Sequence, residues 1–402
     1  MNTHAGMGIK EGKKIKEMLL QQYPGAMVHE RLQGRRSPKY DECRYWILDM
    51  MIDLYTVPPT VATWRDFIDW FIGTWVTPCL SGDKTLVIVF DNSSKSPRNK
   101  ADCQKKRKLS NPAEKIAITD ICDDGVFPNL AGLIATREMR NRAVLYLLVG
   151  VRAHLQSVKP GGARVFVQCP LVAGSKEEYQ RGDAVELTDT HFPLPAECNH
   201  GEADLLIRTW CDHFLQMEPS ASIVVRSIDL DMLPILSAYQ TPVYLHIGKV
   251  APKRPDQRKK PFKGPPPKTH AEYIDIVALG RALKRSGIHI NDFIYACILA
   301  GTDYFNGVTG IGGGRIVATL LKGSLQFSGA RLVESQSRVQ KLLGLAASRS
   351  ADVLLSREQQ ARARWNHEYW LSKVGVPDPL AGGGWVADGD TYTAAGVSAR
   401  AR

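Results

Sequence analysis

Three apolar stretches of this sequence each run directly into an aspartate. The stretches and their acids are residues 45–48 with Asp49, residues 86–90 with Asp91, and residues 222–228 with Asp229. Continuous apolar runs separated by helices are typical of strands in a parallel sheet that is covered on both faces. Ligands of such sheets bind at the carboxyl ends of the strands, where all three aspartates stand. The pattern therefore predicts an α/β fold with a site at that edge.

Two further acids stand near a predicted helix. Glu202 and Asp204 precede an amphipathic pattern at residues 206–214, so they lie in or before the first helical turn. Acids at a helix start also complement the macrodipole, which gives a purely structural explanation for the pair. Residues two apart diverge around a helix axis. Both acids can therefore reach one site only if Glu202 lies at the very start of the turn.

Asp229 is followed two residues later by Asp231. A lone Asp-x-Asp says little, because strand ends and turns often carry acids. Together with the other acids it indicates a cluster, and two bare carboxylates about 4 Å apart repel by roughly 4 kcal/mol at an effective dielectric near 20. Mg²⁺ or Mn²⁺ ions, which prefer oxygen ligands, would relieve this repulsion. In-line phosphodiester hydrolysis uses two such ions, one to generate hydroxide and one to stabilise the leaving oxygen.

A glycine-rich segment follows the last of the acids. A predicted helix ends at Gly301, Asp303 follows, and residues 310–315, Gly-Ile-Gly-Gly-Gly-Arg, open another helix. Glycines let a backbone approach a phosphate closely, and the free N–H groups of a helix start bind it. A flexible loop between two helices is the alternative explanation of the glycines alone.

The composition is that of a globular protein with a basic surplus, 52 Lys and Arg against 41 Asp and Glu. This balance suits a polyanion such as nucleic acid, although a soluble basic protein without such a partner has it too. The cysteines form no Cys-x-x-Cys pair, which predicts reduced, buried thiols and no zinc site. The first residues hold no apolar signal core, and the apolar run 143–149 is too short for a bilayer. We expect a soluble, intracellular protein with no membrane partner.

Several segments mark the organisation of the chain. Helical spacing of aromatic residues predicts a core helix over 64–75, and a basic stretch, a helix and a strand are expected at 92–108, 137–155 and 163–168. Residues 252–268 are rich in proline and positive charge, which indicates a surface linker. Helices are expected at about 271–285 and 291–300, followed by a glycine-rich end from about 377.

The order of these motifs resembles the flap endonuclease superfamily of structure-specific 5′ nucleases, whose core belongs to the PIN-like nucleases. The similarity runs in patches from Met7 to about Lys322. The matching patches are the Met-Gly-Ile start at 7–9, the strand-plus-acid motifs at 47–49 and 89–91, the acid pair at 201–204, the Asp-x-Asp at 229–231, and Leu-Ala-Gly-Thr-Asp-Tyr to Gly-Ile-Gly at 299–312.

The resemblance implies a PIN-like, mostly parallel central sheet flanked by helices, with a C-terminal helix-two-turn-helix subdomain that grips duplex DNA. The implied divisions are a nuclease core at 7–250 with an inserted arch or gate at about 92–200, a basic proline-rich loop at 251–269, the helix-two-turn-helix at 270–325, and a helical extension and tail at 326–402.

By the same resemblance two divalent ions occupy the site. Asp91, Glu202 and Asp204 would hold one ion, with Asp49 acting near it, and the other acids, Asp229, Asp231 and Asp303, would hold the second. Lys95, Arg98 and Lys105 would contact the scissile phosphate from the arch; a solvated or nuclear-import run is the alternative for them. Tyr55 would stack on an unpaired base. A K⁺ ion could sit at the helix-two-turn-helix, and the expected backbone and side-chain contacts to DNA are Gly8, Gly310, Gly312, Gly313, Gly314 and Arg315.

This chain departs from the family pattern at three points. The insertion at 92–200 differs from a standard arch. Asp204 stands where the family usually has Glu, and Gly313-Gly314 replaces Pro-Lys after Gly-Ile-Gly, with Arg315 as a substitute phosphate contact. The C-terminus shows no convincing sliding-clamp motif. The resemblance implies a magnesium-dependent endo- or exonuclease of DNA replication or repair, in the nucleus where there is one, acting on DNA 5′ ends, flaps or junctions. A ribonuclease with the same metal site, or a catalytically inactive nucleic-acid-binding scaffold, are the alternatives.

Overall fold

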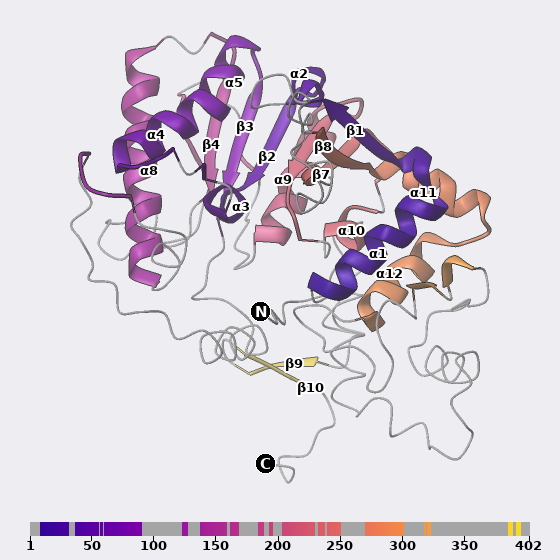
Figure 1. The fold of residues 1–402 in the computed structure, drawn as a ribbon. Helices are drawn as coiled ribbons and strands as arrows, with labels where there is room; N and C mark the ends of the chain where they lie inside the picture. The colour runs from indigo at the N-terminus through magenta and orange to yellow at the C-terminus, as the bar shows by residue number, and fades with distance from the viewer. Residues whose placement is uncertain are drawn as a thin grey trace, which may run out of the picture.

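A computed structural model gives the structure of the chain over most of its N-terminal three quarters and two short C-terminal strands (Figure 1). The described residues are 9–31, 37–55, 57–58, 60–90, 123–127, 137–158, 161–168, 184–188, 193–195, 203–229, 232–237, 239–250, 270–300, 317–318, 320–322, 385–388 and 391–394.

A mixed sheet forms the centre of the molecule, and eight strands of the described residues belong to it. Their order across the sheet is β1-β8-β7-β6-β2-β3-β4-β5. The five strands from β7 to β4 are parallel, whereas β1, β8 and β5 run antiparallel to their neighbours. The strands are β1 Met27–Arg31, β2 Tyr45–Asp49, β3 Thr85–Val89, β4 Arg164–Gln168, β5 Ala184–Glu186, β6 Ile223–Arg226, β7 Val243–Val250 and β8 His270–Asp275.

The three strands predicted from apolar runs ending in an acid are confirmed as β2, β3 and β6, neighbours in the middle of the sheet. Every residue of these strands is buried. Successive side chains alternate between two cores: Trp46 and Leu48 pack on one face of the sheet, and Ile47 packs on the other. A strand with two buried faces has no solvent-facing side, which explains why the runs are almost entirely apolar, with Arg226 in β6 as an exception.

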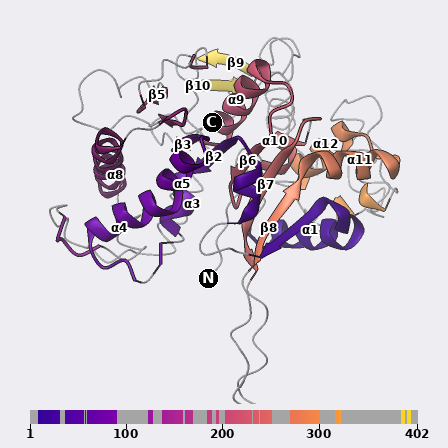
Figure 2. The ribbon, with the colours of Figure 1, turned by 90° about the horizontal axis from the view of Figure 1, so that it is seen from above.

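Helices cover both faces of the sheet (Figures 1 and 2). One core is closed by α1 Ile9–Gln22, α9 Ala203–Met217, α10 Met232–Leu236, α11 Ile276–Arg285 and α12 Ile290–Ala300. The other is closed by α2 Pro38–Glu42, α3 Met50–Tyr55, α4 Trp64–Phe71, a π-helix Ile72–Val76, α5 Thr77–Ser81 and α8 Arg137–Ser157. A 3₁₀ turn, Pro24–Ala26, leads into β1, and the strands β9 Trp385–Asp388 and β10 Thr391–Ala394 form a separate antiparallel pair.

The helix expected at 271–285 begins five residues later than predicted. Residues 270–275 form β8, which pairs with β7 on one side and β1 on the other. Ala271 and Tyr273 enter one core and Ile274 the other, so the segment has the two-residue period of a strand. The helix starts at Ile276, where the Asp275 side chain accepts a hydrogen bond of 2.9 Å from the Ala278 N–H. Residues assigned from sequence to the C-terminal subdomain thus complete the main sheet.

Part of the segment expected to form an arch or gate also belongs to the central layers. The chain leaves β3, returns through α8, and enters β4, which pairs in parallel with β3. The helix and strand predicted at 137–155 and 163–168 are therefore both confirmed. The apolar face of α8 and one face of β4 pack into the same core as α4, so α8 covers the sheet and β4 extends it.

Gly150 of α8 packs tightly against Ile68 of α4. A β-carbon at this position would lie 2.4 Å from Cδ1 and 2.8 Å from Cγ2 of Ile68. Alanine is a better helix former than glycine by about 1 kcal/mol, yet overpacking typically costs about 1–3 kcal/mol. We expect Gly150→Ala to lower the free energy of unfolding, measured by urea denaturation. In an Ile68→Ala background the same change should instead be neutral or stabilising. A stabilising effect in the parent chain would contradict this contact.

Four of the cysteines are described, Cys43, Cys79, Cys211 and Cys297, and all four are buried free thiols, as predicted. Burial raises the pKa of the Cys43 thiol to about 12. A thiol that keeps its proton at neutral pH is a poor nucleophile and a poor metal ligand, so this side chain serves as a small core residue. Among the described helices, none has the length and apolar character needed to cross a membrane.

Candidate functional site

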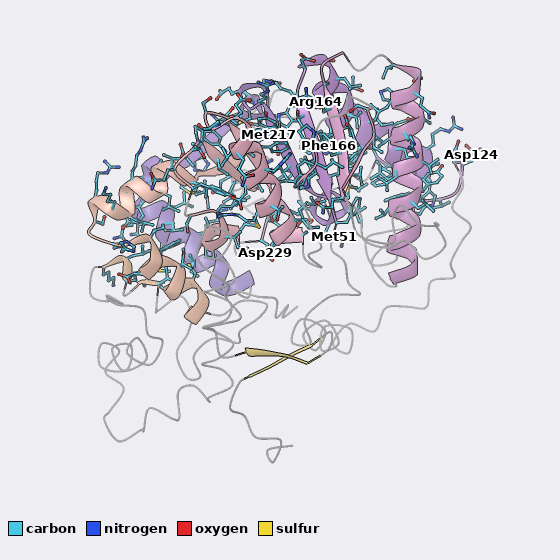
Figure 3. The ribbon with its side chains drawn as sticks, turned by 180° about the vertical axis from the view of Figure 1, so that it is seen from behind. Met51, Asp124, Arg164, Phe166, Met217 and Asp229 are labelled. Carbon is cyan, nitrogen blue, oxygen red and sulfur yellow. The ribbon has the colours of Figure 1, made fainter. Side chains whose placement is uncertain are left out.

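The pairing of β2 with its neighbours brings two of the predicted acids to the same edge of the sheet. Asp49 is the last residue of β2 and lies opposite Val89 at the end of β3. On the other side Leu48 lies opposite Arg226, the last residue of β6, and Asp229 follows three residues later. In Figure 3 the labelled Met51, two residues after Asp49 and the end of β2, lies at the same edge as Asp229.

Helix α9 starts at this edge and crosses the face of the sheet. Near its C-terminal end, Phe214 stacks on Tyr45, the first residue of β2, with ring centroids 4.1 Å apart. Met217, the last residue of α9, lies with Arg164 at the opposite edge (Figure 3). The first turn of the helix, with the partly buried Asp204, is therefore directed toward the carboxyl ends of the strands. The described helix begins at Ala203, and Glu202 lies outside the described residues, so the condition set for this pair of acids stays a prediction.

The carboxylate of Asp49 already has a structural task. Its Oδ1 accepts a hydrogen bond of 3.0 Å from the Met51 N–H and so caps the start of α3. Asp49 is 9% exposed. One carboxylate oxygen thus faces the helix start, and a carboxylate can accept several hydrogen bonds or ligands at once.

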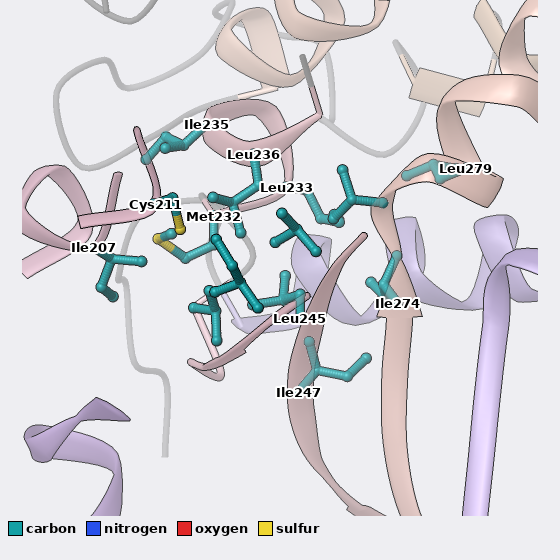
Figure 4. Close-up of a cluster of buried hydrophobic side chains, with 14 of the residues drawn as sticks. Ile207, Cys211, Met232, Leu233, Ile235, Leu236, Leu245, Ile247, Ile274 and Leu279 are labelled. Carbon is teal, nitrogen blue, oxygen red and sulfur yellow. The ribbon is translucent and has the colours of Figure 1, made fainter. Parts of the chain in front are cut away.

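Asp229 lies in the turn between β6 and α10. Its N–H donates to the Ser227 hydroxyl over 3.3 Å, and its carbonyl accepts from the Met232 N–H over 3.3 Å. The side chain is partly buried. Behind this turn, Met232 packs with Cys211 of α9 in the core (Figure 4). The Asp229 backbone is therefore held by the turn on one side and by the α10 core on the other.

Carboxylate oxygens fit Mg²⁺ or Mn²⁺ by chemistry, but the described acids do not make a metal centre by themselves. Within the described part of the chain, no three His, Cys, Asp or Glu side chains are grouped so that they could hold a metal ion. Asp49, Asp204 and Asp229 share an edge without forming such a group. A metal centre here needs acids from the remaining predicted set.

Many predicted site residues lie outside the described residues. These are the acids Asp91, Glu202, Asp231 and Asp303, the arch candidates Lys95, Arg98 and Lys105, and the predicted DNA contacts Gly8, Gly310, Gly312, Gly313, Gly314 and Arg315. For Tyr55 only the backbone is described, at the end of α3.

The structure contains a buried polar network beside the acids that the sequence did not predict. Arg226 donates from Nε to Oδ1 of Asp53 over 2.9 Å, and its side chain is 6% exposed while that of Asp53 is fully buried. The guanidinium also lies 3.3 Å from Nδ1 of His246, and the Tyr40 hydroxyl lies 2.7 Å from the same nitrogen. Because a guanidinium can only donate, Nδ1 acts as the acceptor, and we infer that the imidazole proton is on Nε2.

The charges of this network are fixed at neutral pH. Burial acts to lower the pKa of Arg226, but the Asp53 carboxylate and Tyr40 outweigh it, so the pKa is raised. Burial raises the pKa of Tyr40 well above its ordinary value, although Arg226 acts against it. The network therefore holds one guanidinium, one carboxylate and a neutral phenol. Its signal in the sequence is an arginine inside an otherwise apolar strand.

A second buried arginine joins α9 to α10. Arg208 donates from Nε to both carboxylate oxygens of Asp212, each over 3.1 Å, and from its terminal nitrogen to the Ile235 carbonyl over 2.6 Å. The ring of Tyr239 lies under the guanidinium at 4.0 Å, and its hydroxyl donates to Asp212. The helix that carries Asp204 in its first turn is thereby tied to the helix that follows Asp229.

A comparison of the chain with protein-family models finds no match, and neither does a comparison with curated proteins. The resemblance to flap endonucleases therefore rests on the motifs and their order.

Proposed function

We propose that this protein is a metal-dependent nuclease of the flap endonuclease type, which hydrolyses DNA phosphodiester bonds near 5′ ends or at junctions of single-stranded and duplex DNA. The proposal includes a PIN-like core and a C-terminal helix-two-turn-helix. It rests on the motif order in the sequence and on one structural observation, the shared edge of β2, β3 and β6.

That edge supports the proposal because it follows from the strand register. Asp49 ends β2, Asp229 follows β6, and α9 brings Asp204 toward the same side. Asp49 lies more than 150 residues before both Asp204 and Asp229 in the sequence. In parallel α/β sheets this edge is where ligands bind. A purely structural role as a helix cap explains Asp49. It does not explain why acids from β2, the β6–α10 turn and α9 lie at the same edge.

The residues would divide the work as follows. Two bound divalent ions would supply a hydroxide nucleophile near neutral pH and neutralise charge on the leaving oxygen. One ion would be held on the side of the attacking hydroxide by Asp49, Asp91, Glu202 and Asp204. The other would be held on the side of the leaving oxygen by Asp229, Asp231 and Asp303. The basic surplus would attract the DNA backbone and make binding sensitive to salt.

The proposal is tested with the full chain and end-labelled substrates of one sequence: a 5′ flap, a nick, a blunt duplex and a single strand, in DNA and in RNA. We expect Mg²⁺-dependent cleavage of the flap DNA, no cleavage with EDTA, and a product whose length locates the cut near the junction. Recovery with added Mg²⁺ would show that EDTA acted by removing the metal.

The other outcomes are informative. Preferential cleavage of single-stranded RNA would replace the proposal by a ribonuclease with the same metal site, since tolerance of the 2′-hydroxyl is not encoded in the acids. Binding of DNA without hydrolysis in either Mg²⁺ or Mn²⁺ would indicate an inactive scaffold.

A further inference from the structure

We propose that the buried Arg226–Asp53 pair is a positioning device, which sets the distance and orientation between the Asp49 and Asp229 segments for metal binding. The inference rests on the proposed function and assigns a role to two residues that lie outside the acidic set.

The pair directly connects the two acid-bearing segments. Asp53 stands four residues after Asp49, one helical turn into α3, and Arg226 stands three residues before Asp229, at the end of β6. The 2.9 Å bond from Nε of Arg226 to Oδ1 of Asp53 therefore links α3 to the strand that leads to Asp229. The same segments are also joined by the backbone pairing of β2 with β6, whose register extends to Leu48 and Arg226. The ion pair continues this connection beyond the paired residues.

Aromatic and imidazole side chains fix the orientation of the guanidinium. Trp75 of the π-helix lies 5.2 Å from it, His246 of β7 accepts a hydrogen bond, and Tyr40 of α2 holds the imidazole. Tyr40 in turn lies 5.2 Å from Trp75, ring centre to ring centre. A π-helix is an uncommon insertion that frequently occurs at functional sites. Here it supplies one wall around the arginine.

Stability alone does not explain a charged pair at this place. Replacing a buried ion pair by apolar residues of similar volume is often neutral or stabilising, because desolvation offsets the attraction. What the charged pair adds is geometry, since a guanidinium donates in fixed directions. Side chains that orient metal ligands typically change metal affinity about 10–100-fold when they are replaced.

The test measures Mn²⁺ binding to the full chain by electron paramagnetic resonance of the free aquo ion, at a temperature where circular dichroism shows every variant folded. The variants are Asp53→Asn, Arg226→Gln and Arg226→Lys. A variant that is merely less stable but still folded would bind Mn²⁺ as the parent does. Arg226→Lys keeps the positive charge beside Asp53 but loses the planar guanidinium with its fixed donor directions, so it separates the effect of orientation from that of charge. This variant also remains informative if a neutral variant fails to fold.

The control is Arg44→Gln. Arg44 forms an Arg–carboxylate pair of 3.0 Å with Glu218 at the opposite edge of the same sheet. We expect this variant to bind Mn²⁺ within about twofold of the parent, while the three test variants lose about tenfold or more.

Three results would overturn the inference. Arg226→Gln could bind Mn²⁺ more tightly while Asp53→Asn binds it less tightly, which is the signature of net charge and not of position. All three variants could match the parent, which would remove the positioning role and leave the proposed function standing. A parent chain that binds no Mn²⁺ would overturn the proposed function, and the inference with it.

Discussion

Replacing Asp229 and Asp231 together by Asn is expected to abolish Mg²⁺-dependent cleavage of a 5′-flap substrate while leaving DNA affinity within about twofold. The cleavage rate should fall by at least about a thousandfold, which corresponds to ~4 kcal/mol of transition-state stabilisation. A bound metal ion contributes several kcal/mol of such stabilisation. Asn is close to Asp in size but neutral, so it removes the metal's attraction without opening a cavity. DNA affinity comes mainly from contacts to phosphates and should persist.

A second pair of variants separates charge from structure at this edge. Asp49→Asn removes the charge, yet an Asn side-chain oxygen can still accept the Met51 N–H bond that caps α3. Loss of cleavage with unchanged unfolding free energy would therefore be a loss of charge alone. Asp83→Asn is the control: Asp83 is an exposed acid in the turn before β3, at the far edge, with φ of 54°, a conformation that Asn tolerates. This variant should cleave as the parent does.

Cleavage is followed by initial rates at saturating enzyme, and DNA binding by fluorescence anisotropy in EDTA. Undiminished cleavage by the Asp229→Asn, Asp231→Asn double variant would remove these residues from the metal site. Equal losses in the Asp83→Asn control would indicate a general effect of surface charge instead.

The middle of the fold could be predicted because its signal is local and redundant. A run such as residues 86–90 has no polar residue on either face, and no element other than a doubly covered strand or a buried helix accepts that pattern. The short length of the run and the acid that follows it favour a strand over a buried helix. The parallel order of β2, β3 and β6 then follows from the helices between them.

The edges of the sheet could not be predicted in the same way. β8 pairs with β7 and β1, and the latter lies more than 200 residues earlier in the chain. The sequence of residues 270–275 is compatible with a strand and with the start of an amphipathic helix. The neighbouring strands determine which one forms, and sequence periodicity carries no information about them.

In the candidate site, too, the features that depend on local sequence could be predicted, and those that depend on long-range contacts could not. That Asp49 and Asp229 share an edge follows from strand ends, which sequence shows. That Asp53 pairs with Arg226 depends on a contact across 173 residues. An arginine within an apolar strand indicates a buried partner, because a buried charge is rarely left unpaired, but it does not say which acid supplies it. The structure places Asp204 in the first turn of α9, whereas Glu202, its predicted partner, lies outside the described residues.

Trp210→Ala is expected to lower the free energy of unfolding by about 3–5 kcal/mol, the usual cost of removing a large buried aromatic side chain. Trp210 is fully buried in the middle of α9. Its ring lies 5.1 Å from that of Phe166 on β4 and 5.3 Å from that of Phe214, and its indole N–H donates to Gln168 over 2.7 Å. No smaller residue could fill this space between the helix and the strand.

Urea denaturation followed by circular dichroism measures the effect, and Met217→Ala is the matched control on the same helix. Met217 is 45% exposed, so its truncation should cost less than about 0.5 kcal/mol. Trp210→Phe keeps an aromatic ring and loses the indole hydrogen bond, and we expect an intermediate cost of about 1–2 kcal/mol. A loss below about 1 kcal/mol in Trp210→Ala would mean that α9 is held elsewhere, with Arg208 the first residue to examine.

The same variant also connects the core to the proposed chemistry. Asp204 stands about two helical turns before Trp210, so a helix that rocks on the sheet moves that carboxylate directly. In Trp210→Ala protein that is still folded, Mn²⁺ affinity should therefore fall, whereas in Met217→Ala protein it should not. If Mn²⁺ affinity is unchanged while stability falls as expected, Asp204 is not a metal ligand, and the acid at the start of α9 is there to complement the helix dipole.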